Sequence, residues 1–185
     1  MNLALLLILA IIVIGFILTY NTVISKKNNV DNALGAIDAE LKKRRDLIPN
    51  LVESVKAYMQ YEKDLLEKIT RLRESAEKIE DPEKRLQIEQ ELSKALQSLK
   101  VRFENYPNLK ANRNFLQLQA TLTDVEESIA AARRFYNQAA TEYNNILEQI
   151  PFTFIAKMLG LQKKEVFTIS EEERANIDIG ELFKK

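Results

Sequence analysis

The feature that most constrains this chain is an unbroken apolar run near its beginning, from Leu3 to Leu18. The first charged side chain after it is that of Lys26. Eighteen residues of α-helix rise about 27 Å, which is just enough to cross a hydrocarbon core of about 30 Å when the end residues reach the interface. Tyr20 follows the run, and an aromatic ring with a polar tip is favoured at a membrane–water interface. The run therefore predicts a single transmembrane helix.

A cleaved signal peptide and a buried core helix are the alternatives for this run. A signal peptide requires a positive n-region and a small-x-small cleavage site, and neither flank of the run supplies one. A buried helix that is apolar on all sides needs a large surrounding shell. Lys26, Lys27 and the basic run 42–45 all follow the apolar segment. The positive-inside bias therefore predicts a single-pass protein of the cell membrane, with its N-terminus outside and its soluble domain in the cytoplasm.

The rest of the chain is predicted to be helical. Only four glycines and four prolines occur among 185 residues, and 29% of the residues are charged, which is typical of helical rather than turn-rich proteins. Apolar residues recur at alternating spacings of four and three, as the seam of a helical bundle or coiled coil requires. The longest stripe runs from Phe115 to Ile150, and shorter stripes cover residues 30–41, 51–79 and 92–106.

Prolines mark three places where these helices are expected to end, namely Pro49, Pro82 and Pro107, because proline disfavours helix in the residue before it. The predicted fold class is therefore all-α, with a transmembrane helix followed by an antiparallel four-helix up-and-down bundle. The alternative is three long helices, in which Pro49 only kinks one helix over residues 22–80. The expected organisation is a transmembrane anchor at 1–20, a helical bundle at 21–150, and a short C-terminal helix with a partly mobile tail at 151–185.

Three motifs resemble those of the LemA family of bacterial membrane proteins. They are Lys42-Lys-Arg-Arg-Asp-Leu-Ile-Pro-Asn-Leu-Val-Glu-Ser-Val-Lys56, then Tyr106-Pro-Asn-Leu-Lys-Ala-Asn112 followed by Phe115-Leu-Gln-Leu-Gln119, and Ala132-Arg-Arg-Phe-Tyr-Asn137 followed by Tyr143-Asn144. The resemblance covers residues 1–167 in matching order. It implies a one-pass anchor, a helical soluble domain and an association with membrane proteolysis or envelope homeostasis. Tyr61 stands where the family often has His, so no role of that His transfers.

Two groups of residues are candidate binding sites. Polar and aromatic residues at the predicted helix ends are candidates for binding a partner: Arg44, Arg45, Asp46, Asn50, Asn105, Tyr106, Asn108, Lys110 and Asn112. The alternative is that their Asn and Asp side chains only cap helix ends. Apolar residues interspersed with lysines are candidates for contact with a membrane interface: Phe152, Phe154, Ile155, Met158, Leu159 and Leu161. Packing against protein is the alternative for this second group.

Glu62 falls on an apolar seam, where a buried carboxylate must be paired or neutralised. The expected partners are Arg44, Arg45, Arg133 or Arg134. The alternative is that Glu62 lies at the wet edge of an imperfect seam.

The composition argues against an enzyme. The chain has neither Cys nor His, which removes the thiol nucleophile, the commonest general base and the commonest transition-metal ligand. No glycine-rich phosphate loop is present, and nothing singles out a catalytic pair among the 27 acidic residues. The formal net charge of +0 gives no nucleic-acid signature. We therefore expect no cofactor, no metal and no nucleic-acid partner.

The leading hypothesis is a non-enzymatic, membrane-anchored scaffold or adaptor that binds another membrane or envelope protein, with a membrane protease as one candidate partner. The alternative is a self-assembling or membrane-shaping structural protein, in which the heptads run between copies of a homo-oligomer. A carboxylate-based hydrolase is a remote third hypothesis. In all three hypotheses the lipid bilayer is the first partner.

Overall fold

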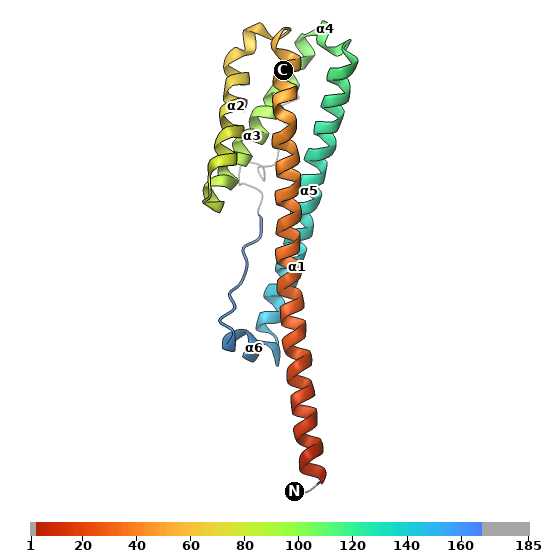
Figure 1. Ribbon diagram of the computed structural model, residues 1–185, viewed down its shortest axis with the longest axis vertical. Helices are drawn as coiled ribbons and strands as arrows, with labels where there is room; N and C mark the ends of the chain where they lie inside the picture. Colours follow the sequence, from red (N-terminus) through yellow and green to blue (C-terminus); the bar gives the residue numbers. More distant parts are fainter. Residues whose placement is uncertain (1–2, 168–185) are drawn as a thin grey trace, which may run out of the picture. The chain divides into compact units, whose positions relative to one another are not determined.

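A computed structural model describes residues 3–167 and shows helices without strands over that range (Figure 1). The helices are α1 (Leu3–Lys56), α2 (Lys63–Lys78), α3 (Pro82–Arg102), α4 (Pro107–Lys110), α5 (Arg113–Glu148) and α6 (Phe152–Met158), with 3-10 turns η1 (Gln60–Glu62) and η2 (Phe103–Asn105). The predicted all-α class is therefore confirmed. The partly mobile tail predicted within residues 151–185 lies outside the described residues from residue 168 onward.

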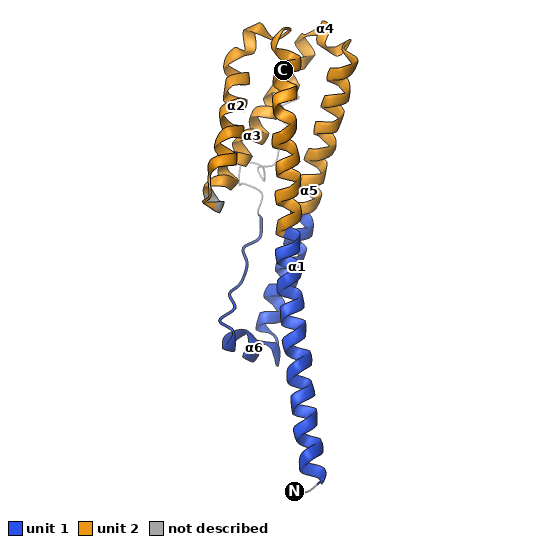
Figure 2. Cartoon of the chain, viewed as in Figure 1, with its two compact units in different colours: residues 1–33, 133–185 blue, residues 34–132 orange. Residues whose placement is uncertain are grey.

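Tertiary contacts divide the chain into two compact units (Figure 2). Unit 1 comprises residues 1–33 and 133–185, and unit 2 comprises residues 34–132. The long helices α1 and α5 contribute residues to both units. The organisation predicted from the sequence, with boundaries at residues 20 and 150, stays a prediction.

Unit 2 contains four helical segments that alternate in direction: the C-terminal part of α1, then α2, α3 and the N-terminal part of α5 (Figure 1). Their apolar seams meet in one core: Ile48, Leu51, Val55, Met59, Leu66, Ile69, Leu92, Ala95, Leu96, Leu99, Phe103, Leu109 and Phe115. Phe103 and Phe115 pack edge to face with ring centroids 4.7 Å apart, an arrangement that aromatic quadrupoles favour. This up-and-down order is compatible with the predicted bundle.

The predicted turn at Pro49 is wrong, because α1 continues through this proline to Lys56. A proline inside a helix has no N–H to donate to the carbonyl four residues earlier, which here belongs to Arg45. Arg73 on α2 supplies the missing donor, since its Nε lies 3.0 Å from that carbonyl oxygen. The backbone defect is therefore satisfied from a neighbouring helix.

The packing of α1 explains why the helix continues. Its buried positions on either side of the proline follow one uninterrupted four-and-three pattern: Ile37, Leu41, Arg44, Ile48, Leu51 and Val55. Pro49 itself is exposed, so its ring does not disturb this seam. Tertiary packing thus overrides the local preference for a break.

The chain turns after α1 at residues 57–62 instead, where no proline or glycine marks a turn. Met59 is fully buried at this turn and its backbone N–H donates to the carbonyl of Val55 at 2.9 Å. The other two proline-based predictions are confirmed, because α3 begins at Pro82 and α4 begins at Pro107.

Unit 1 contains the apolar beginning of α1. This helix is long and apolar enough to cross a membrane, and only 6% of its most apolar window is buried. That exposure contradicts the alternative of a buried core helix. Further along α1, Lys26 Nζ lies 2.7 Å from Glu142 Oε2 of α5.

The predicted short C-terminal helix is present as α6, which follows Pro151 directly. Gly160 lies just beyond its end with φ +63°, a left-handed conformation that costs glycine little. The next residues, 161–167, run in an extended conformation along α5, and we call this segment the strap.

Two asparagines of α5 hold the strap. Asn144 donates to the carbonyl of Lys164 and accepts from its N–H, both at 2.8 Å. Asn137 makes the same pair of bonds with Phe167, again at 2.8 Å. Each side-chain amide therefore replaces the partner that a neighbouring strand would supply.

Candidate functional site

Two charged residues occupy core positions of unit 2. Arg44 continues the apolar seam of α1, and Glu89 continues that of α3, three residues before Leu92. Both side chains are 0% exposed. Buried charges are tolerated only when they are paired and hydrogen-bonded, so their partners define a candidate site.

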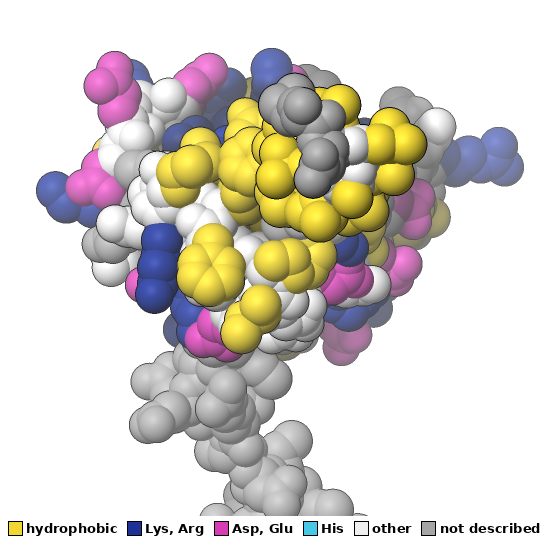
Figure 3. All heavy atoms as spheres, turned by 90° about the horizontal axis from the view of Figure 1, so that it is seen from below, with side chains coloured by type: hydrophobic (Ala, Val, Ile, Leu, Met, Phe, Trp, Pro, Cys, Tyr) yellow, Lys and Arg dark blue, Asp and Glu magenta, His cyan; other side chains and the backbone are white. Residues whose placement is uncertain are grey.

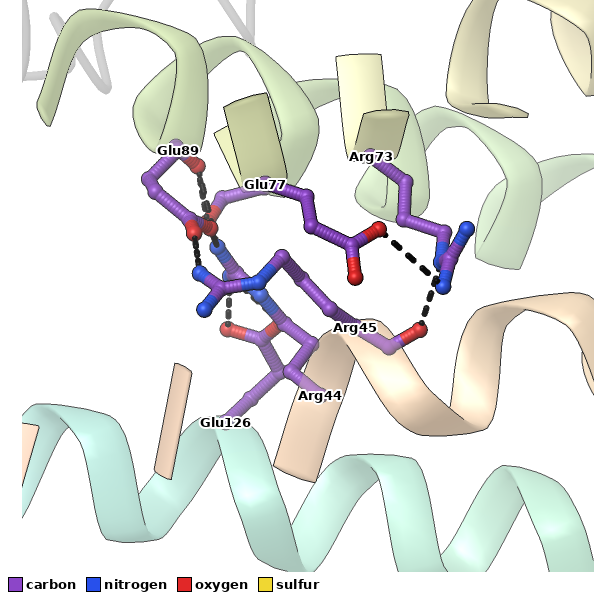
Figure 4. Close-up of polar contacts among 7 residues, drawn as sticks. Arg44, Arg45, Arg73, Glu77, Glu89 and Glu126 are labelled. Carbon is purple, nitrogen blue, oxygen red and sulfur yellow. Dashed lines mark hydrogen bonds and ion pairs between the residues drawn. The ribbon is translucent and has the colours of Figure 1, made fainter. Parts of the chain in front are cut away.

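Arg44 lies at the centre of this network (Figure 4). One guanidinium nitrogen, Nη2, donates to a Glu89 carboxylate oxygen and to the Glu89 main-chain carbonyl, the latter at 3.2 Å. The other, Nη1, donates to Ser93 Oγ at 2.6 Å and to Glu126 Oε1 of α5 at 2.9 Å. Arg44 Nε has no hydrogen-bond partner within the part of the chain that the structure describes. A single side chain on α1 therefore joins α3 and α5.

Arg45 and Arg73 extend the network to α2 (Figure 4). Arg45 Nη1 donates to the second carboxylate oxygen of Glu89. Arg73 Nη2 lies 3.4 Å from Glu77 Oε2, and its Nε binds the Arg45 carbonyl that Pro49 leaves free. Glu89 thus has an arginine on each carboxylate oxygen. The three arginines face three glutamates, so the network, which we call the arginine–glutamate network, is balanced in charge.

A groove opens beside this core, between the end of α1 and the first half of α2. Its volume is about 720 Å³, within the range of ligand sites. Its lining residues are Val52, Glu53, Lys56, Met59, Gln60, Lys63, Leu66, Glu67, Thr70 and Arg71. Apolar side chains and charged side chains of both signs therefore share this groove.

The two turn regions of unit 2 at residues 57–62 and 103–112 contain a polar cluster. Glu62 pairs with Arg102, and not with the arginines expected from the sequence. Burial and the neighbouring Glu62 carboxylate raise the pKa of Tyr106. Asn112 Oδ1 accepts from the backbone N–H groups of residues 114 and 115 at 3.0 and 3.3 Å. Asn112 therefore caps α5, as the capping alternative predicted.

The predicted partner-binding residues do not lie together. Arg44 and Arg45 belong to the network, about 18–20 Å along α1 from the turn that follows it. Asp46 pairs with Lys42 at 2.9 Å, and this contact lowers the pKa of Asp46. Among the remaining predicted residues, Tyr106 and Asn112 are half-buried. The others are exposed: Asn50, Asn105, Asn108 and Lys110.

The predicted membrane-interface residues fall on two faces of α6 and its flanks. Ile155 is buried, and Phe152 and Leu161 are partly buried. Phe154, Met158 and Leu159 are exposed. An apolar exposed face therefore remains on this short helix.

Comparison with known proteins identifies the family of this chain. The profile of the LemA family matches residues 33–180. Protein LemA of Metamycoplasma hominis is 30% identical over 163 residues, which cover 88% of this chain and 74% of that relative. This chain belongs to the LemA family.

Two magnetosome proteins resemble part of this LemA-family chain. Magnetosome protein MamQ 2 of Paramagnetospirillum magneticum is 30% identical over 73 residues, and Magnetosome protein MamQ of Magnetospirillum gryphiswaldense is 29% identical over 73 residues. Each match covers 40% of this chain and 27% of the relative. The likeness is therefore local.

The motifs that resembled the LemA family now have structural roles. The first motif carries the buried Arg44, the partly buried Arg45 and Pro49, which leaves free the Arg45 carbonyl that Arg73 binds. The second contains the cap of α5, and the third supplies Asn137 and Asn144, which hold the strap.

The LemA-family network contains residues that the sequence analysis missed, above all Glu89 and Glu126. Glu89 had a readable signal, because it extends the stripe of Leu92, Leu96 and Leu99 by one regular step. Glu126 lies beside the buried Val125 rather than on its seam, so no periodicity distinguished it. The structure contains no cluster of three or more candidate metal ligands within the residues it describes.

Proposed function

We propose that this LemA-family chain is a membrane-anchored, non-enzymatic adaptor that binds an amphipathic helix of another membrane protein. The observation that supports this proposal is the groove between α1 and α2. Helices recognise amphipathic helices through apolar grooves with charged margins, and two neighbouring helices form the natural bed for a third.

The chemistry of the groove supports a helical occupant. Val52, Met59 and Leu66 give it an apolar floor, and Met59 is fully buried. Glu67 lies 3.7 Å from Lys63 and 3.6 Å from Arg71. Such exposed ion pairs contribute little to stability, so their groups are free to exchange partners with an incoming helix.

The anchor supports a partner in the same membrane. The apolar beginning of α1 provides the span, and the basic residues that follow it favour a cytoplasmic position for unit 2. Because the chain contains no cysteine, Ser25→Cys gives a single labelling site. Labelling of Ser25→Cys by an impermeant maleimide in intact cells would reverse this topology.

The groove is tested by photocrosslinking of the full-length chain in native membranes. A photoreactive amino acid at Gln60, in the groove, should form an adduct of discrete mass. The same group at Lys100, which is exposed on α3, is the control and should not. Thr70→Trp should fill the groove and abolish the Gln60 adduct while helicity and unfolding stay unchanged. An adduct that survives Thr70→Trp would contradict the proposal.

A further inference from the structure

The exposed face of α6 and the apolar part of α1 both belong to unit 1, so their levels can be compared. Viewed from the N-terminal end, hydrophobic side chains gather over the apolar helix, and further hydrophobic side chains lie beside it (Figure 3). Such an apolar face is unfavourable in water, because each exposed apolar side chain lacks the favourable free energy of burial.

The contacts of α5 with α1 give the level of α6. Lys26 of α1 pairs with Glu142 of α5 at 2.7 Å, and the two helices run in opposite directions in unit 1 (Figure 1). From Glu142 to Glu148, α5 advances six residues, or about 9 Å. The same distance back along α1 leads from Lys26 to Tyr20. The end of α5 therefore lies level with the end of the apolar run.

Exposed apolar side chains follow the end of α5. Ile150, Phe154 and Met158 recur at intervals of four residues and are 78%, 65% and 60% exposed. The opposite face of α6 is buried through Ile155 and Ala156. This short helix is thus packed on protein on one side and bare and apolar on the other, at the level where the membrane begins.

Basic residues adjoin this apolar face. Lys157 lies on α6, while Lys163 and Lys164 lie in the strap, where Lys163 pairs with Glu148. Lysines beside apolar side chains suit a membrane interface, since the stem lies along lipid while the charge stays in water.

We infer that α6 lies in the interface of the same bilayer that holds α1, with Ile150, Phe154 and Met158 in contact with lipid. This inference rests on the membrane anchor of the proposed function. Unit 1 then contacts the membrane at two places, through α1 and through α6. The strap, which Asn137 and Asn144 of α5 bind, holds α6 at the membrane surface.

The test uses the full-length chain in phosphatidylcholine vesicles. The sequence contains no tryptophan, so Phe154→Trp introduces a single indole reporter. Phe135→Trp is the matched control, because Phe135 is 56% exposed on α5 and lies about 20 Å before the C-terminal end of that helix. Phe16→Trp reports insertion of the anchor.

Brominated phosphatidylcholine should quench Phe154→Trp and Phe16→Trp, whereas aqueous acrylamide should quench Phe135→Trp. Met158→Trp should repeat the Phe154→Trp result. If Phe16→Trp is quenched by lipid and Phe154→Trp only by acrylamide, the inference is overturned while the anchor stands. An indole at residue 154 that is shielded from both quenchers also overturns it, since protein then covers α6. Failure of Phe16→Trp to respond to lipid would overturn the anchor and the inference together.

Discussion

Replacing Glu89 by Gln is the most direct perturbation of the arginine–glutamate network. The change keeps the shape of the side chain but removes the charge that faces both Arg44 and Arg45. Since Arg44 is completely buried, water cannot replace the lost carboxylate. Glu126 remains 2.9 Å from Arg44 and offsets only part of the loss.

The expected magnitude follows from burial. Removing one partner of a buried ion pair costs about 3–5 kcal/mol, and we expect about 3 kcal/mol here because Glu126 remains. A domain is stable by only about 5–15 kcal/mol. At an m-value of ~2 kcal/mol/M, this loss lowers the urea midpoint by about 1.5 M.

The assay is urea unfolding of the full-length chain in detergent micelles, followed by far-UV circular dichroism. Glu91→Gln is the matched control, because Glu91 is exposed on the same helix and its charge should matter by less than about 0.5 kcal/mol. A loss as small as that for Glu89→Gln, which is typical of a surface ion pair, would refute the burial of this carboxylate.

Three further outcomes are expected. Leu99→Ala should cost about 2–5 kcal/mol in urea unfolding, because Leu99 is fully buried in the core of unit 2. Arg73→Gln should cost about 1 kcal/mol through the lost bond to the free carbonyl of α1, and less in a Pro49→Ala background, where the helix supplies its own donor. The hydrogen bond from Lys26, and then that from Gln138, lower the pKa of Glu142. The stabilisation by these two hydrogen bonds is therefore complete above a pH of ~4.3 and is lost as the pH falls through the lowered pKa of Glu142. The Glu142→Gln variant should accordingly approach wild-type stability only in acid.

A specific result would contradict each of these three predictions. Val101→Ala, at a 66% exposed position, should cost almost nothing, and an equal cost to that of Leu99→Ala would mean that the seam of α3 faces elsewhere. Equal effects of Arg73→Gln in both backgrounds would separate Arg73 from the Pro49 defect. A Glu142→Gln deficit that grows in acid would reverse the sign of the linkage.

The periodicity of apolar residues predicts most of the fold. The prediction is wrong where a local signal, the proline at position 49, contradicts that periodicity. The seam of α1 passes through Pro49 without a change of spacing, whereas the local preference of proline predicts a break there and leaves a kinked helix as the alternative. The decisive compensation, a guanidinium from α2 on the free carbonyl, depends on tertiary structure and has no signature near Pro49. Conversely, the turn at residues 57–62 has no proline or glycine, so composition could not predict it.

The candidate site was predicted in part, for a related reason. The motif of Arg44 and Arg45 predicts a partner-binding surface, although position 44 is a regular member of a buried stripe. The seam pattern predicts a charged member only at Glu62, whose partner in the structure is Arg102. Pairing across helices requires knowing which residues share a level, and that knowledge comes from the fold.

The strap has one further consequence, which concerns length. Asn137 and Asn144 are seven helical residues apart, or about 10.5 Å along the axis, and they bind residues three apart in an extended chain, which span about 10 Å. The two spacings match only at this ratio of seven to three. An insertion of one residue between Lys164 and Phe167 must therefore release one asparagine or buckle the strap. Relatives that keep both asparagines should accordingly keep this interval exact, even where the side chains within it vary.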